Sequence, residues 1–121
     1  MFLCLGLSMA FSQNADETIS AAIKLGNYKE LSSYFDTKID LTIWSKEDSY
    51  SKAQAELIIK DFFGKDKVTN YQVIHRGKSP DGAKYAIGTL TTTNNEYRTY
   101  VLTKEVGKTV RIQQLRFEEK E

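Results

Sequence analysis

The chain divides into two halves with different hydrophobic periodicity, and this division limits its fold more than any other feature. Up to Gly64 the apolar residues recur mainly at helical spacing, in three short segments. From Tyr71 to Phe117 they alternate with polar residues in four segments separated by turn residues, as antiparallel strands do. Helices that come before the strands, rather than between them, predict an α+β domain with helical segments packed on one curved antiparallel sheet.

Each of the three helical segments begins with a capping side chain that is followed three residues later by Glu or Gln. The pairs are Asn14 with Glu17, Asn27 with Glu30, and Ser51 with Gln54. Glycines at 26 and 64 predict the ends of the first and third helices. The third helix has one continuous apolar stripe, so we expect it to cover the core. The stripe contains Ala55, Ile58, Ile59, Phe62 and Phe63.

Residues 36–44 lie between the second and third helices and alternate with period two. Ile39, Leu41 and Ile43 share one face, which predicts a short edge strand. The polar stretch from Ser45 to Ser49 is expected to lead from this strand into the third helix.

The last strand changes parity in its middle. Val110 and Ile112 share one face, whereas Leu115 and Phe117 fall on the other. An extra residue at Gln113-Gln114 would return all four side chains to one face, so the pattern predicts a β-bulge there.

Size and charge limit the classes of function. A chain of 121 residues with 40% hydrophobic content suits one domain with a single core. The 17 Lys and Arg residues nearly balance the 16 Asp and Glu residues, and the two signs are interspersed. Binding to nucleic acid needs clustered positive charge, so we expect no nucleic-acid partner.

Residues 1–12 form an apolar leader that ends in small residues, as a signal peptide does. We interpret it as an export signal, cleaved after Ser12, with residues 13–121 as a single exported domain in the periplasm or medium. No Lys or Arg precedes Lys24, so a start codon placed too far downstream, or a buried N-terminal strand, stays open. The run is about half of the ~20 residues that a spanning helix needs, which predicts no stable membrane anchor.

The second strand of the meander is apolar on both faces. Tyr85 and Ile87 share one face, and Ala86, Gly88 and Leu90 share the other. A sheet covered on one side does not need this pattern. We therefore expect a second copy of the protein to cover Tyr85 and Ile87, which would make a homodimer through the sheet.

Several short runs resemble a small family of exported bacterial proteins of unknown function. These runs are Tyr50-Ser51-Lys52-Ala53-Gln54-Ala55, Asp61-Phe62-Phe63, His75-Arg76-Gly77, Tyr85-Ala86-Ile87-Gly88 and Tyr97-Arg98-Thr99-Tyr100. The element order is similar to the nuclear transport factor 2-like, or cystatin-type, cone, in which a curved sheet wraps the third helix. The resemblance implies this fold and an exported location, but no reaction and no catalytic residue.

The sequence contains few residues for catalysis or metal binding. His75 is the only histidine, and the single cysteine, Cys4, lies in the leader, so we expect no metal and no other cofactor. His75 shares parity with Tyr71, which favours a half-buried packing role. Asp40 and Asp61 are the only acids close to apolar runs, and both are predicted to face solvent, so no catalytic residue is assigned.

Aromatic and basic residues of the strand half predict a surface for a small ligand or a protein partner. The candidates are His75, Arg76, Tyr85, Tyr97, Arg98 and Tyr100. The competing interpretation is cross-strand packing with Arg98 in solvent. The favoured function is therefore a non-enzymatic exported binding module. The alternatives are a pocket enzyme of the isomerase or dehydratase type, as the resemblance allows, and a purely structural subunit.

Overall fold

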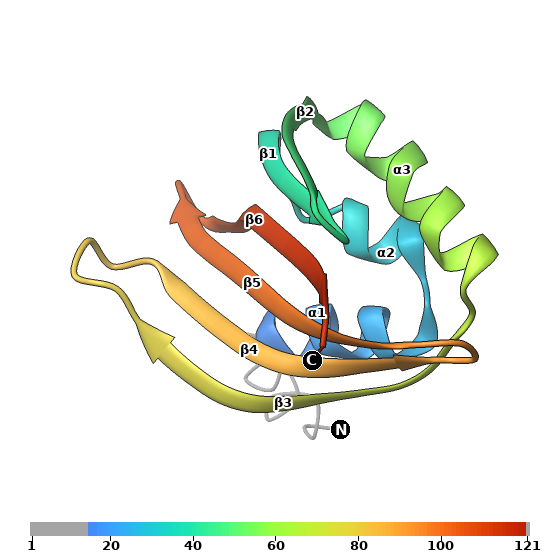
Figure 1. Ribbon diagram of the computed structural model, residues 1–121. Coiled ribbons are helices and arrows are strands. Elements are labelled where there is room, and N and C mark those ends of the chain that lie inside the picture. Colours follow the sequence, from blue (N-terminus) through green and yellow to red (C-terminus); the bar gives the residue numbers. More distant parts are fainter. Residues whose placement is uncertain (1–14, 121) are drawn as a thin grey trace, which may run out of the picture.

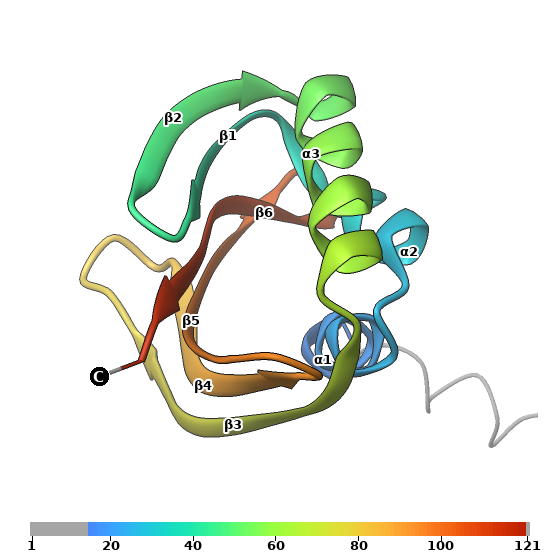
Figure 2. The ribbon, with the colours of Figure 1, turned by 45° about the vertical axis from the view of Figure 1, so that its right-hand side comes forward.

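The computed structural model describes residues 15–120, which form three helices and one six-stranded sheet. The elements are α1 (Ala15–Leu25), α2 (Tyr28–Ser32), β1 (Phe35–Ile43), β2 (Lys46–Ser51), α3 (Lys52–Lys65), β3 (Val68–Lys78), β4 (Lys84–Thr92), β5 (Glu96–Val106) and β6 (Thr109–Glu119). The sheet curves strongly, and the three helices lie across its concave side (Figures 1 and 2). The predicted α+β class is confirmed.

Three sequence-based expectations fall outside the described residues. They are the leader at residues 1–12, the position of Cys4 and the cap at Asn14.

The strands are ordered β2-β1-β6-β5-β4-β3. Strands β3 to β6 form the predicted antiparallel meander, and β1 adds to it in parallel with β6. The prediction of β1 as an edge strand is wrong, because the polar stretch after Trp44 turns back and pairs antiparallel with β1 as β2. β2 was missed because its side chains are mostly exposed and lack an apolar face.

The helices begin and end where the sequence predicts, except at the end of α3. The Asn27 side chain accepts from the Glu30 backbone N–H at 3.1 Å, and Ser51 forms a capping box with Gln54. Gly26 has a φ of +66° and ends α1. Gly64 does not end α3, which continues to Lys65 and has Asp66 as its C-cap.

Two bulges decide which side chains face the core. In β6, Leu102 pairs with Gln114 and Thr103 with Ile112, so Gln113 is the extra residue and the predicted bulge is confirmed. In β3, Val73 pairs with Gly88 but His75 pairs with Ile87. This second bulge turns His75 to the outer face, where it is exposed, so its predicted half-buried position beside Tyr71 is wrong.

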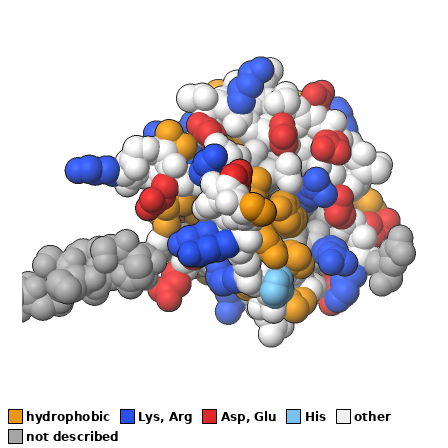
Figure 3. Space-filling model, turned by 90° about the vertical axis from the view of Figure 1, so that its left-hand side faces the viewer, with side chains coloured by type: hydrophobic (Ala, Val, Ile, Leu, Met, Phe, Trp, Pro, Cys, Tyr) orange, Lys and Arg blue, Asp and Glu red, His pale blue; other side chains and the backbone are white. Residues whose placement is uncertain are grey.

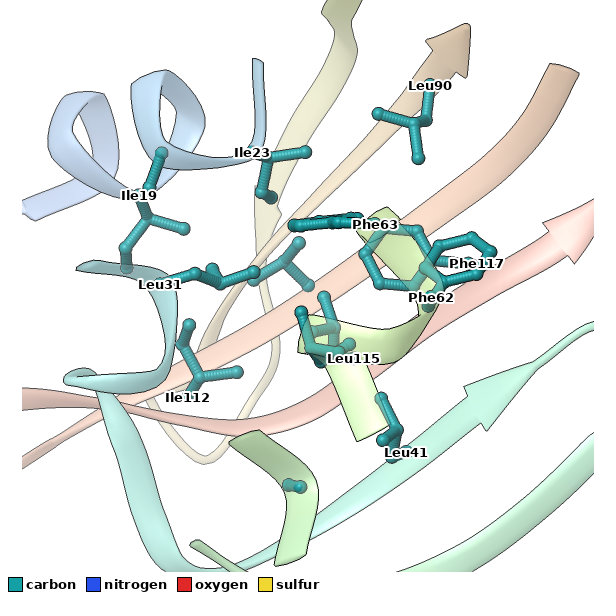
Figure 4. Packing of buried hydrophobic residues seen from close by; sticks show 14 of the residues in the cluster. Ile19, Ile23, Leu31, Leu41, Phe62, Phe63, Leu90, Ile112, Leu115 and Phe117 are labelled. Atoms are coloured by element: carbon teal, nitrogen blue, oxygen red, sulfur yellow. The ribbon is translucent and has the colours of Figure 1, made fainter. Parts of the chain in front are cut away.

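The core lies between the concave face of the sheet and the helices. Figure 4 shows apolar side chains from α1, α2, α3 and the strands meeting there. Phe62 and Phe63 of α3 both pack against Phe117 of β6, with ring centroids 5.2 and 6.0 Å apart. α3 thus covers one end of the sheet, and the other side of Phe62 is left to border a pocket.

Candidate functional site

A pocket of about 460 Å³ opens where the end of α3, the β1–β2 hairpin and the β4–β5 turn meet. This volume is within the usual range for small-molecule sites. Its apolar wall consists of Leu41, Ile43, Trp44, Tyr50, Ile58, Phe62 and Tyr97. Its polar side consists of Lys46, Asp61, Lys65, Asp66, Asn94 and Asn95. One apolar wall, rich in aromatic residues, and one polar side therefore meet in a single open site.

Trp44 stands at the mouth of this pocket in an unusual backbone conformation. Its φ is +62°, and no other non-glycine residue among residues 15–120 has a positive φ. The left-handed region is unfavourable for a bulky side chain and is often occupied at functional sites. The Trp44 backbone N–H donates to the Phe117 carbonyl at 2.8 Å, which holds the turn against β6. The indole remains 43% exposed and contacts the Tyr97 ring edge-to-face at 5.6 Å.

Asp66 is the buried acid of the pocket, with only 7% of its surface exposed. Its Oδ2 accepts from the Tyr97 hydroxyl at 2.7 Å and from Asn95 Nδ2 at 3.0 Å. Its Oδ1 accepts from the Asn94 backbone N–H at 3.3 Å and from Asn94 Nδ2 at 3.2 Å. The carboxylate therefore fastens the end of α3 to the β4–β5 turn.

These bonds set the protonation state of the site. Burial raises the pKa of Asp66, but the hydrogen bonds from Asn95, Tyr97 and the Asn94 backbone outweigh burial and lower the pKa to about 2. Burial, and then the hydrogen bond and negative charge of Asp66, raise the pKa of Tyr97 well above its ordinary value. At neutral pH the pair is an ionised carboxylate and a neutral phenol.

The other charged groups of the pocket lie at its exposed rim. Lys65 and Asp61 pair with each other at 3.2 Å, one turn apart on α3, with side chains 77% and 66% exposed. Lys46 is exposed at the start of β2 and forms no ion pair within residues 15–120. Asp61 and Asp40 are both exposed, as predicted.

Four of the six predicted site residues gather on the outer, convex face of the sheet. The rings of His75 and Tyr85 are 5.8 Å apart, and Tyr85 stacks on Tyr100 at 6.0 Å. Arg116 covers the other side of Tyr100 at 5.4 Å, and Arg98 is exposed on the same face. Figure 3 shows hydrophobic side chains beside the histidine on this side of the molecule.

The other two predicted residues lie elsewhere. Arg76 faces α1, where it donates to the Ser20 hydroxyl at 3.3 Å and lies 3.9 Å from an Asp16 carboxylate oxygen. Tyr97 points to the concave side and borders the pocket. The run from Tyr97 to Tyr100 is thus split between two faces, because successive strand residues point to opposite sides.

The polar end and mouth of the pocket were missed from the sequence. Asp66 follows a glycine after a helical stripe, a place that predicts a helix end rather than a burial site. Asn94-Asn95 lies between two alternating segments and indicates only a turn, and Trp44 indicates only the end of a strand. The single available signal was that the one tryptophan of the chain sits directly before a polar turn.

The described residues contain neither a cluster of His, Cys, Asp or Glu suited to a metal ion nor a helix long and apolar enough to cross a bilayer.

Comparison with solved structures identifies the fold as a nuclear transport factor 2-like cone. A structure described as Rd1NTF2_04 with long sheet aligns with a TM-score of 0.68 over 88% of this chain and 98% of its own, at 15% identity. Identity at this level shows the fold alone.

The chain belongs to the DUF4783 family, whose description is a domain of unknown function and whose model matches residues 16–118. A family protein from Bacteroides uniformis is 33% identical, with a TM-score of 0.84 over 89% of this chain and 99% of its own. One from Bacteroides ovatus is also 33% identical, with a TM-score of 0.81 over 86% and 94%. The suspected family and fold are confirmed. No curated protein matches the chain significantly.

Proposed function

We propose that the protein is an exported, non-enzymatic module that binds a small ligand in the pocket at the mouth of the cone. The observation that carries the proposal is the exposed Trp44 ring, held in an unfavourable backbone conformation at the edge of an aromatic pocket. The ring keeps 43% of its surface exposed in this strained position, so a ligand contact explains the position better than packing alone does.

The alternative is a pocket enzyme of the isomerase or dehydratase type. Such an enzyme needs an acid or base whose pKa is near the working pH. The buried acid of this pocket, Asp66, has a pKa of about 2 and hydrogen bonds to both of its oxygens. It is better suited to hold the pocket together and set its charge than to transfer protons, which supports the binding module.

The test is native mass spectrometry of the protein purified gently from its own compartment, together with a variant that fills the pocket. Ile58→Phe adds bulk at a half-buried position of the pocket wall, and Leu57→Phe makes the same kind of change at the adjacent exposed residue. We expect a small co-purifying mass in the wild type and in Leu57→Phe, but not in Ile58→Phe. A heteromeric mass with an empty pocket would indicate a protein partner and contradict the small-ligand proposal.

Export is also proposed, on the apolar leader at residues 1–12. Expression of the full chain in its own host should yield a periplasmic or secreted protein whose mass corresponds to cleavage after Ser12. An uncleaved protein in the cytoplasm would contradict this proposal.

We further propose that the outer face of the sheet pairs with a second copy. Ile74 is 66% exposed there, beside Ile87 and the Tyr85–Tyr100 stack, and Arg98 neighbours Glu118 across the strands. A two-fold axis can therefore place opposite charges together around an apolar centre. Light scattering should give a dimer that Ile74→Lys disrupts and Leu25→Lys, an exposed change on α1, does not; a monomeric wild type would refute the pairing.

A further inference from the structure

The charge on Asp66 has no cationic counterpart in the part of the chain that the structure describes. No Lys, Arg or His nitrogen of residues 15–120 lies within 4.0 Å of its carboxylate. All four of its hydrogen-bond donors belong to uncharged groups. Buried charges in proteins are usually paired with an opposite charge. The pocket wall at Asp66 thus carries a buried negative charge without a cationic partner among residues 15–120.

Four aromatic residues line the same pocket as this charge. Trp44, Tyr50, Phe62 and Tyr97 all border the pocket, and Trp44 and Tyr50 keep exposed surface that a ligand can cover. The faces of such rings attract cations, tryptophan most strongly, and several rings together form the cages that bind quaternary ammonium groups.

The two lysines of the pocket lie at its rim, so they offset the negative charge of Asp66 only there. Lys65 already pairs with Asp61, and Lys46 extends from an exposed strand. Exposed charges are screened within about 8 Å at physiological ionic strength, whereas a buried charge is screened much less. The interior of the pocket therefore favours a positive group, even though its four formal charges sum to zero.

On the basis of the proposed function, we infer that the ligand is a small organic cation of the quaternary ammonium class, with its charged head between Trp44, Tyr50 and the buried Asp66 carboxylate. A primary ammonium suits this site less well. Each Asp66 oxygen already accepts two hydrogen bonds, so a primary ammonium would lose its bonds to water without gaining equivalent ones. An alkylated cation has no N–H groups to satisfy.

Trp44 provides a direct measurement, because it is the only tryptophan of the chain. Its emission would be followed during titration with choline, with the neutral carbon isostere dimethylbutanol, with the primary amine ethanolamine and with the anion pivalate. We expect choline to bind at least about tenfold more tightly than each of the other three, which corresponds to ~1.4 kcal/mol.

Two variants separate the buried charge from the rim. Asp66→Asn should remove the preference for choline over dimethylbutanol, in a protein whose fold is checked by circular dichroism. Lys46→Gln leaves the fold unaffected, since the side chain is exposed. It should tighten choline binding by up to about threefold, because it removes a like charge from the pocket.

The inference is overturned if dimethylbutanol or pivalate binds as tightly as choline, or if Lys46→Gln weakens choline. Binding of those probes would leave the pocket itself, and hence the proposed function, intact. If none of the four probes changes Trp44 emission, the cation class is also refuted. The co-purification experiment with Ile58→Phe then decides the proposed function independently.

Discussion

At the scale of single residues, Trp44 has an unfavourable backbone conformation and Asp66 has a buried charge. Trp44 adopts a left-handed backbone conformation, which costs roughly 1–2 kcal/mol for a residue with a side chain. Asp66 buries a charge, and hydrogen bonds from neutral groups compensate for the lost water. Both residues lie in the pocket, and backbone strain such as that of Trp44 clusters at functional sites.

The first prediction concerns pH. The Asp66 carboxyl titrates near 3.8 in the unfolded chain and near 2 in the folded protein. Because the folded pKa is lower, the ionised group stabilises the fold above about pH 4, and this stabilisation disappears as the pH falls through 2. The shift corresponds to about 2 kcal/mol. Urea unfolding followed by Trp44 emission should therefore show a steeper loss of stability between pH 4 and pH 2 in the wild type than in Asp66→Asn.

The matched control is Asp61→Asn, which changes an exposed acid at the same pocket. Its surface pair with Lys65 is worth at most ~1 kcal/mol, so its pH profile should follow the wild type. Equal pH dependence in the wild type and Asp66→Asn would mean that the folded pKa of Asp66 is not lowered.

The second prediction tests whether Trp44 is retained for folding or for binding. Trp44→Gly relieves the backbone conformation, worth roughly 1 kcal/mol, and loses the edge-to-face contact with Tyr97, worth about as much. The free energy of unfolding from thermal melts by circular dichroism should therefore change by no more than about 1 kcal/mol. The co-purifying ligand should be lost. Phe62→Ala, which removes a buried ring, should cost about 3–5 kcal/mol instead. A similar cost at Trp44 would assign it to the core.

At the scale of elements, capping side chains determined where helices begin, and the bulge at Gln113 determined which side chains of β6 face the core. Ser51 and Gln54 start α3 as their spacing predicts. Local signals did not determine the end of α3. The helix continues past Gly64, and its C-cap Asp66 bonds to Asn94 and Asn95 on a turn that is distant in sequence. That contact determines where the pocket has its polar end.

The third prediction is that Ser51→Ala destabilises the protein by about 1 kcal/mol, since the Gln54 backbone N–H loses its acceptor. Ser49→Ala, an exposed change two residues earlier in β2, should stay within ~0.5 kcal/mol. Chemical unfolding measures both. Equal costs would mean that the capping box does not stabilise α3.

The fourth prediction concerns the β6 bulge. Deleting Gln113 would make Ile112 and Gln114 consecutive residues opposite Thr103 and Leu102, so β6 would alternate regularly and Leu115 and Phe117 would stay on the core face. The deletion should therefore keep the folded circular dichroism spectrum. Gln113→Ala keeps the register and loses only the Nε2 bond to Asp36, so it should cost ~1 kcal/mol. An unfolded deletion variant would mean that the sheet needs the bulge itself, and not only the side-chain alternation on each side of it.

At the scale of the whole molecule, one edge of the sheet is much less protected than its centre. β2 is the edge strand beside the pocket, and its side chains are mostly exposed, whereas β1 and β6 lie inside the sheet and supply much of the core. The pocket therefore has one wall in an exposed edge hairpin and another in α3, which packs on the core.

The fifth prediction follows from this asymmetry. Hydrogen exchange of the free protein should be fastest in β2 and slowest in β1, β5 and β6, because local opening requires less burial to be lost at an exposed edge. A bound ligand should slow exchange in β2 and the hairpin at Trp44 more than in β3, the opposite edge. Protection confined to β3 would place the ligand away from the pocket.

The sequence by itself determined the helical and strand halves, the caps at Asn27 and Ser51, the meander and the Gln113 bulge, because periodicity and capping depend on near neighbours. It also predicted the cone, through its resemblance to a family. Only the tertiary structure decided that β2 is a strand, that a bulge turns His75 outward, and that Asp66 and Trp44 share a pocket. These features depend on pairing and burial between segments far apart in the chain, which no local pattern records.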